Sequence, residues 1–132
     1  MTATIGSEAV VIDSSGWLEY ITGDVKADLF APYFENDLRL LVPVLVLFEV
    51  RKVLLRPGSL LPRKHVELFE SVALRREVIS IDEHIALSAA TLSLNFKLAM
   101  ADALVYATAQ RSGARLVTSD MHFDNLPGVT IL

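Results

Sequence analysis

Short apolar runs, rich in valine, isoleucine and leucine, recur along this chain. Each contains four or five residues and is bounded by polar or turn-forming residues, which is typical of a buried strand. The first run, AVVI, is followed directly by an aspartate. The predicted strands span residues 10–13, 38–42, 77–81, 115–118 and 129–132.

Between these runs, apolar residues recur every three or four positions, which predicts amphipathic helices. Ser14 or Ser15 is expected to cap the first helix, and Gly23 to end it. Asp24 and Asp82 are expected to cap the second and fifth helices. The alternation of strands and helices indicates a single α/β domain over residues 1–132, with a mostly parallel sheet. The predicted helices span residues 15–22, 25–34, 43–56, 62–76, 83–96 and 101–111.

Four acidic residues occupy places where α/β folds build functional sites. Asp13 and Asp120 follow apolar strands, Asp102 lies in the first turn of an alanine-rich helix, and Glu49 lies inside an apolar helix. Strand ends and helix starts converge on one edge of a parallel sheet, so these side chains are expected to meet there. They are referred to below as the acidic quartet.

Each member of the quartet also has a purely structural explanation. Asp13 and Asp120 could bond the turns that follow them, and Asp102 could complement a helix dipole. Glu49 could pair with Lys52, because the residues around it are otherwise mostly apolar. The combination favours a shared site, since crowded carboxylates repel one another unless a cation is bound. Oxygen ligands without cysteine favour Mg²⁺ or Mn²⁺ over zinc.

Composition narrows the class of protein further. The 132 residues include no cysteine, which excludes disulfides and thiolate metal sites and suits a cytoplasmic location. A net charge of −4 argues against a protein that coats nucleic acid, but a metal at an acidic site would still attract phosphate. We expect no secretory signal and no association with a membrane, because the longest apolar run, 40–48, contains a proline and falls short of the roughly 20 residues of a membrane span.

Three segments, VVIDSSGWLEY, LFEV and MADALVYATAQRSGARLVTSDMHF, together resemble the PIN-domain ribonucleases, and most closely the VapC toxins of bacterial toxin–antitoxin pairs. The resemblance extends from Val10 to Leu132. Its most specific part is Asp102 at the start of an alanine-rich helix, followed by a glycine, an apolar strand and the motif T-x-D-x-x-F from Thr118 to Phe123. The resemblance implies a PIN-like three-layer α/β/α sandwich.

The resemblance also implies roles for individual residues. The acidic quartet would be catalytic and would bind Mg²⁺ or Mn²⁺, with Ser14 as a supporting contact beside Asp13 and Thr118 as the hydroxyl residue before Asp120. Many relatives carry an acid immediately before the last phenylalanine, where this chain has His122. From the sequence alone, His122 could reach the site or lie in a surface turn. Arg51 and Lys52 belong to a basic helical hairpin that could contact the RNA backbone or form a solvated face.

The implied activity is hydrolysis of RNA, with tRNA or ribosomal RNA as common targets. The implied partners are a second copy of the chain, in a homodimer, and a cognate VapB-type antitoxin. A housekeeping PIN nuclease would carry the same quartet, and an inactive binding module would keep only the fold. An aspartyl-phosphatase would need a second aspartate where Ser15 stands, and a dinucleotide-binding domain would need a glycine-rich loop after the first strand.

Overall fold

A parallel sheet of five strands forms the centre of this computed structural model, which describes residues 8–132. The strand that comes first in the sequence lies in the middle of the sheet, so the sheet grows outward on both sides of it. The strands are β1 (Ala9–Ile12), β2 (Arg39–Pro43), β3 (Glu77–Ile79), β4 (Arg115–Thr118) and β5 (Val129–Ile131), in the spatial order β3-β2-β1-β4-β5.

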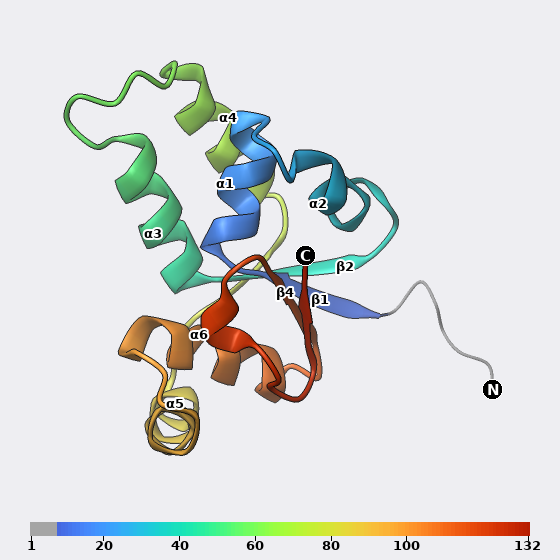
Figure 1. Ribbon diagram of the computed structural model, residues 1–132, viewed down its shortest axis with the longest axis vertical. Coiled ribbons are helices and arrows are strands. Elements are labelled where there is room, and N and C mark those ends of the chain that lie inside the picture. Colours follow the sequence, from blue (N-terminus) through green and yellow to red (C-terminus); the bar gives the residue numbers. More distant parts are fainter. Residues whose placement is uncertain (1–7) are drawn as a thin grey trace.

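Helices cover both faces of this sheet. Figure 1 shows α1 to α4 on one face and α5 and α6 on the other, which gives the expected three-layer α/β/α sandwich. The sheet is parallel throughout, where the sequence predicted a mostly parallel one. The helices are α1 (Ser14–Thr22), α2 (Ala27–Glu35), α3 (Val44–Leu54), α4 (Lys64–Ala73), α5 (Glu83–Phe96) and α6 (Met100–Arg111), and a short 3₁₀ helix, η2, spans Met121–Phe123.

The central strands are buried on both faces, as their unbroken apolar sequences predict. Val11 is fully buried and pairs with Leu41 of β2 on one side and Leu116 of β4 on the other. Because β1 pairs in parallel with both neighbours, the residues that follow all three strands lie at one edge of the sheet. That edge is where the candidate site forms.

Aromatic side chains lock the helical layer of α1, α2 and α4 together. The ring of Trp17 meets Phe34 edge-on at 4.7 Å and Phe69 at 5.3 Å between centroids. Gly16 lies so close to Ile12 and Phe30 that a Cβ atom there would come within 2.5 Å and 2.6 Å of their side chains. The first turn of α1 is therefore held tightly against the sheet, directly beside Asp13.

Two of the predicted helix caps are wrong and two are confirmed. Asp13 itself caps α1 by accepting a hydrogen bond from the Gly16 N–H, so neither Ser14 nor Ser15 is the cap. Helix α2 begins only at Ala27 and has no side-chain cap, because Asp24 bonds the adjacent N–H of Val25 instead. Gly23 ends α1 in the left-handed conformation, and Asp82 caps α5 through the N–H of Ile85.

The arms of the helical hairpin are shorter than predicted. Helix α3 ends at Leu54 instead of residue 56, and α4 spans Lys64–Ala73 instead of 62–76. Pro43 is the last residue of β2 and precedes α3, because its fixed φ suits a strand end as well as a helix start. Strand β4 matches its prediction of 115–118. Between residues 8 and 132, no helix has the length and apolarity needed to cross a bilayer.

Candidate metal centre

The acidic quartet converges at the carboxyl edge of the sheet. Asp13 follows the central strand β1, and Asp120 lies two residues after its neighbour β4. Glu49 is on α3, which follows β2 on the other side of β1, and Asp102 is in the first turn of α6. The charges of Asp13, Asp102 and Asp120 all act on Glu49, so the four carboxyl groups lie within electrostatic reach of one another.

Asp13 is fixed in place by hydrogen bonds to both of its oxygens. Its Oδ1 accepts from the Ser15 hydroxyl at 2.7 Å and from the Gly16 N–H at 3.3 Å. Its Oδ2 accepts from the Thr118 hydroxyl at 2.7 Å. The residue is only 5% exposed, and this burial raises the pKa of its carboxyl group despite the three donors.

The hydroxyls of Ser15 and Thr118 also tie the β1 end to the β4 end. Thr118 accepts the Asp120 N–H at 2.9 Å, and Ser15 accepts the Ser119 N–H at 3.2 Å. Each hydroxyl therefore donates to Asp13 and accepts from the backbone that leads to Asp120. The relative placement of these two acids is set by the backbone of both strands.

Glu49 reaches the edge from α3 and is half-buried. Burial is the largest cause of the raised pKa of its carboxyl group, a hydrogen bond with the Ser14 side chain opposes it, and Asp102 and the other acids raise it further. Ser14, which was expected to support Asp13, therefore supports Glu49 instead, and its neighbour Ser15 supports Asp13. Among the described residues, Glu49 and Lys52 form no ion pair. Instead, the Lys52 ammonium lies 5.6 Å from the centre of the Phe48 ring.

Asp102, Asp120 and His122 form the part of the site that is open to solvent. Nδ1 of His122 lies 3.1 Å from Oδ1 of Asp120 and 3.8 Å from Oδ2 of Asp102. Each of the three offers one possible ligand atom, and these atoms all lie within 4.8 Å of one another. Burial, followed by the charge of Asp120, raises the pKa of Asp102, and His122 opposes the shift.

These residues fit a divalent cation. Three of the four carboxyl groups have a raised pKa, because each loses solvation and faces other acids. A bound cation would offset that repulsion, and a set of carboxylate oxygens is what Mg²⁺ and Mn²⁺ prefer. The expected choice of Mg²⁺ or Mn²⁺ therefore agrees with the donor set.

The family can now be stated, because the family model described as PIN domain matches residues 10–129. The chain is a member of the PIN-domain family. No curated protein matches the sequence significantly.

Several solved structures with the same fold come from toxin–antitoxin systems, at low sequence identity. A toxin–antitoxin complex from Klebsiella pneumoniae has a TM-score of 0.77 at 20% identity and covers 92% of this chain and 95% of its own. DNA-bound VapBC from Salmonella typhimurium has a TM-score of 0.72 at 17% identity, covering 95% and 97%. VapC20 of Mycobacterium tuberculosis, described as a toxin that cleaves the sarcin–ricin loop, has a TM-score of 0.68 at 15% identity, covering 89% and 91%. At these identities, the likeness establishes a shared fold.

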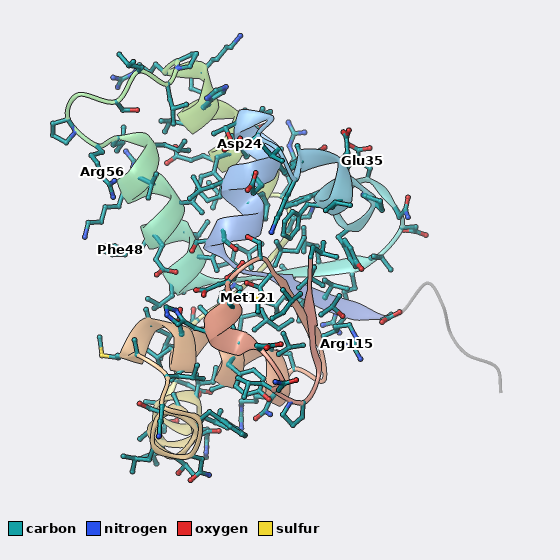
Figure 2. All side chains as sticks on the ribbon, in the orientation of Figure 1. Asp24, Glu35, Phe48, Arg56, Arg115 and Met121 are labelled. Atoms are coloured by element: carbon teal, nitrogen blue, oxygen red, sulfur yellow. The ribbon has the colours of Figure 1, made fainter. Side chains whose placement is uncertain are left out.

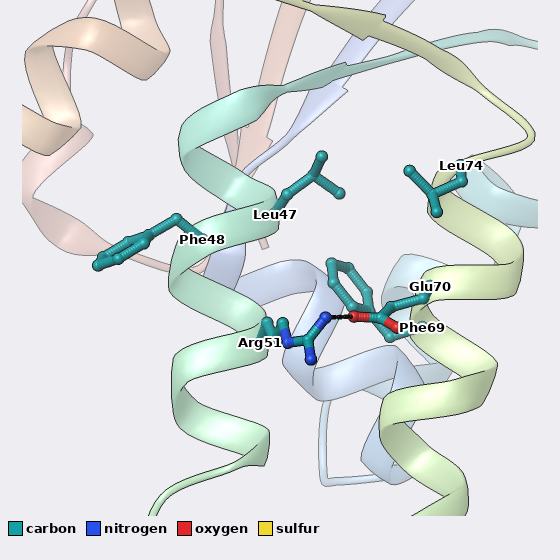
Figure 3. A pocket seen from close by; sticks show the side chains of 6 residues that line it. All are labelled: Leu47, Phe48, Arg51, Phe69, Glu70 and Leu74. Atoms are coloured by element: carbon teal, nitrogen blue, oxygen red, sulfur yellow. Dashed lines mark hydrogen bonds and ion pairs between the residues drawn. The ribbon is translucent and has the colours of Figure 1, made fainter.

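The two basic residues considered as RNA contacts in this PIN domain differ in their surroundings. The Arg51 guanidinium pairs with Glu70 of α4 at 2.5 Å, as Figure 3 shows, so its charge is partly neutralised. Lys52 is exposed, and its ammonium lies over the Phe48 ring with no carboxylate partner among the described residues. Phe48 and Arg56 lie along the outer side of this helix (Figure 2). Lys52 is therefore the better candidate for a contact with phosphate.

Two residues of this PIN domain were not assigned to the centre from the sequence. The sequence predicts Ser15 only as a possible helix cap, whereas its hydroxyl bonds the Asp13 carboxylate. An aspartate before a turn usually bonds the backbone two residues on, and this tendency is the one local signal that brings Asp13 close to residue 15. His122 had been left open between the site and a surface turn. His122 lies in a surface turn and also reaches the site, because its ring is largely exposed while Nδ1 faces two of the acids.

Proposed function

We propose that this PIN domain is a Mg²⁺- or Mn²⁺-dependent endoribonuclease and the toxin of a toxin–antitoxin pair, acting in the cytoplasm. One observation carries the nuclease part of this proposal. Four carboxyl groups from four separate segments meet at one edge of the sheet, in a family whose members are typically nucleases. Like charges are not gathered in this way without a cation or a proton to offset them.

The residues of the centre have different roles in this proposal. Asp13 is the fixed end of the centre, because hydrogen bonds to both oxygens prevent it from turning. Asp102, Asp120 and Glu49 are more accessible and would hold the ion. When bound, a divalent cation would supply charge neutralisation for the scissile phosphate and a lowered pKa for water. Thr118 and Ser15 act as positioning residues through Asp13.

The toxin part of the proposal is supported by the structural neighbours, which are toxins or toxin–antitoxin complexes. We expect tRNA or ribosomal RNA to be the substrate. A VapB-type antitoxin would require an apolar surface, and the helical hairpin offers Leu55, Leu60 and Leu61, all exposed. The neighbouring Leu54 is buried and belongs to the core. A homodimer would use a different apolar face, described in the Discussion.

A housekeeping PIN nuclease is the second candidate, since it would have the same centre. The two differ in their effect on the cell. A toxin arrests growth when expressed alone and is neutralised by a protein encoded beside it, whereas a processing nuclease does neither.

The test is cleavage of pooled cellular RNA by purified protein with Mg²⁺ or Mn²⁺, with EDTA and Asp13→Asn as controls. We expect metal-dependent cutting that the variant loses, and mapped ends would identify the target. Folded, antitoxin-free protein that cuts with neither metal would favour the inactive binding module. Cutting by Asp13→Asn at the wild-type rate would remove the quartet from the mechanism.

A further inference from the structure

His122 is held beside the acidic centre by the turn in which it lies. Asp120 begins the short 3₁₀ helix η2, and its Oδ1 accepts the backbone N–H of His122 at 2.9 Å. That bond fixes the backbone of His122 relative to the Asp120 carboxylate. The imidazole then extends over the same carboxylate and faces Asp102 across it.

The distances between possible ligand atoms suit a shared ion. In octahedral coordination with bonds of about 2.1 Å, adjacent ligand atoms lie about 3.0 Å apart and opposite ones about 4.2 Å apart. Nδ1 of His122 lies 3.1 Å from Oδ1 of Asp120 and 3.8 Å from Oδ2 of Asp102. The first separation equals that of adjacent ligands, and the second falls between adjacent and opposite. Nδ1 can therefore complete a ligand set with both carboxylates.

The other two histidines of the chain are placed differently. His84 is exposed and lies in the first turn of α5. His65 lies on α4, which covers the other face of the sheet from α5. His122 is also not a core residue, because 79% of its side chain is exposed. Neither packing nor a distant partner explains why its ring faces two acids.

From this geometry we infer that His122 coordinates the ion directly through Nδ1, together with Asp102 and Asp120, and that the centre consequently selects Mn²⁺ over Mg²⁺. Mg²⁺ binds through carboxylates, phosphates and water, whereas an imidazole suits transition metals. Mn²⁺ is the transition metal that also suits the carboxylates of this centre. This inference rests on the proposed metal-dependent function and names the ion that the same centre takes.

The experiment measures Mn²⁺ binding directly, without reference to cleavage. Electron paramagnetic resonance gives the affinity for Mn²⁺, and spin-echo modulation of the bound ion detects a coordinated nitrogen. Competition with Mg²⁺ gives the ratio of the two affinities. The proteins are wild type, His122→Ala, His122→Asp and the matched surface control His84→Ala, with Asp102→Asn to define loss of the site.

We expect nitrogen modulation in wild type and His84→Ala, and none in either His122 variant. His122→Ala should bind Mn²⁺ at least about tenfold more weakly, with a much smaller change for Mg²⁺. His122→Asp should retain binding of both ions, because it supplies an oxygen ligand, but with a lower ratio of Mn²⁺ to Mg²⁺ affinity. If His122→Asp folds and binds both ions, the weaker Mn²⁺ binding of His122→Ala cannot be explained by a general disturbance of the turn at residue 122.

Two kinds of failure can be told apart. If wild type binds Mn²⁺ in a manner that Asp102→Asn abolishes, but without nitrogen modulation, the inference about His122 is overturned and the metal-dependent nuclease survives. The same holds if His122→Ala keeps the wild-type ratio of affinities. If wild type binds neither ion and does not cut RNA, the proposed function fails as well.

Discussion

The hydroxyl of Thr118 makes two hydrogen bonds that join two acids of the centre. It donates to Oδ2 of Asp13 at 2.7 Å and accepts the N–H of Asp120 at 2.9 Å, and the residue is fully buried. Valine has nearly the same shape as threonine, but its side chain can neither donate nor accept a hydrogen bond. A Thr118→Val variant would leave a buried carboxylate oxygen and a backbone N–H without these partners.

We therefore expect Thr118→Val to fold and to lose about 10–100-fold in kcat/KM for RNA cleavage, as is usual when a group supporting a metal centre is removed. The matched control is Thr130→Val, whose hydroxyl accepts only from exposed Arg115. That control should keep its activity within about twofold, because exposed polar pairs contribute little. Equal losses in both variants would contradict a specific role for Thr118.

The charge of Asp102 should cost stability when no metal is bound. Burial and Asp120 raise its pKa in the folded chain, so between its unfolded and folded pKa values the folded state binds more protons. Stability then falls as pH rises through that range. In EDTA at pH 7, Asp102→Asn should melt about 2–4 °C above wild type. The difference should shrink toward pH 4 and disappear below about pH 3, where the Asp102 carboxyl group of the unfolded chain is protonated too.

Calorimetry or circular dichroism over pH 4–8 measures the two melting temperatures. With saturating Mn²⁺, wild type should melt at a higher temperature than Asp102→Asn. A gain in melting temperature that is the same at pH 4 and pH 7 would mean that the effect is not electrostatic.

Single residues of the centre were predictable to different degrees. The quartet could be chosen from the sequence because Asp13 and Asp120 follow strands, and parallel strands end at one edge. The hydrogen-bond partner of each acid could not be predicted, because Ser14 and Ser15 are adjacent and identical. Only the geometry of the helix assigns Ser15 to Asp13 and Ser14 to Glu49. The role of His122 depends on the turn of η2, which no periodic pattern reveals.

At the scale of elements, the junction between β1 and α1 is the most constrained part of the fold. Gly16 gives its N–H to Asp13 while lying against the side chains of Ile12 and Phe30. A methyl group there would come within 2.5 Å of Ile12 and 2.6 Å of Phe30, so the helix would have to move away from the sheet. That movement would also displace the donors of Asp13.

Gly16→Ala should consequently lose both stability and activity. Overpacking of this kind typically costs about 1–3 kcal/mol in the free energy of unfolding. Gly23→Ala serves as the control, because its only difficulty is a φ of +68° with open space around it. It should cost about 1–2 kcal/mol and leave cleavage unchanged below its melting temperature. Urea denaturation and cleavage of RNA at 25 °C measure the two effects separately. Full activity in folded Gly16→Ala would contradict the coupling.

The order and type of the elements could be predicted, but several of their ends could not. A buried strand such as Ala9–Ile12 has a continuous apolar sequence that stops at a polar residue. Helix α2 was placed two residues early because Asp24 has the residue type of a cap, while the chain forms a turn at 24–26 before the helix starts. The preference of a residue type for a helix cap is only a local tendency. The burial of Phe30 and Phe34 in the core decides where the helix runs.

At the scale of the whole molecule, two apolar surfaces on opposite faces of the sandwich have no partner among the described residues. The hairpin of α3 and α4 exposes Leu60 almost completely, at 99%. On the other face, α5 and α6 expose Leu87, Leu94 and Met100, and Leu94 is 83% exposed. Large apolar residues gathered in this way usually mark interfaces. Under the proposed function, the first surface would bind the antitoxin and the second would bind a second copy of the chain.

These assignments predict separable defects. Leu94→Glu should convert a homodimer to a monomer in light scattering and leave capture of the genomically adjacent antitoxin intact. Leu60→Glu should weaken that capture by about tenfold and leave the dimer intact, because each charge is buried at only one interface. Each variant is the control for the other. The assignments would be contradicted if Leu60→Glu dissociated the dimer or if Leu94→Glu lost the antitoxin.

The only tryptophan of the chain, Trp17, is fully buried between Phe34 and Phe69, and its indole N–H has no hydrogen-bond partner among the described residues. Such an indole should emit at short wavelength, because no water or polar acceptor relaxes its excited state. It also lies one turn of α1 beyond Asp13. Its fluorescence is therefore a built-in optical probe that reports unfolding and that can sense, without any label, the tightening of the first turn when a cation enters the centre.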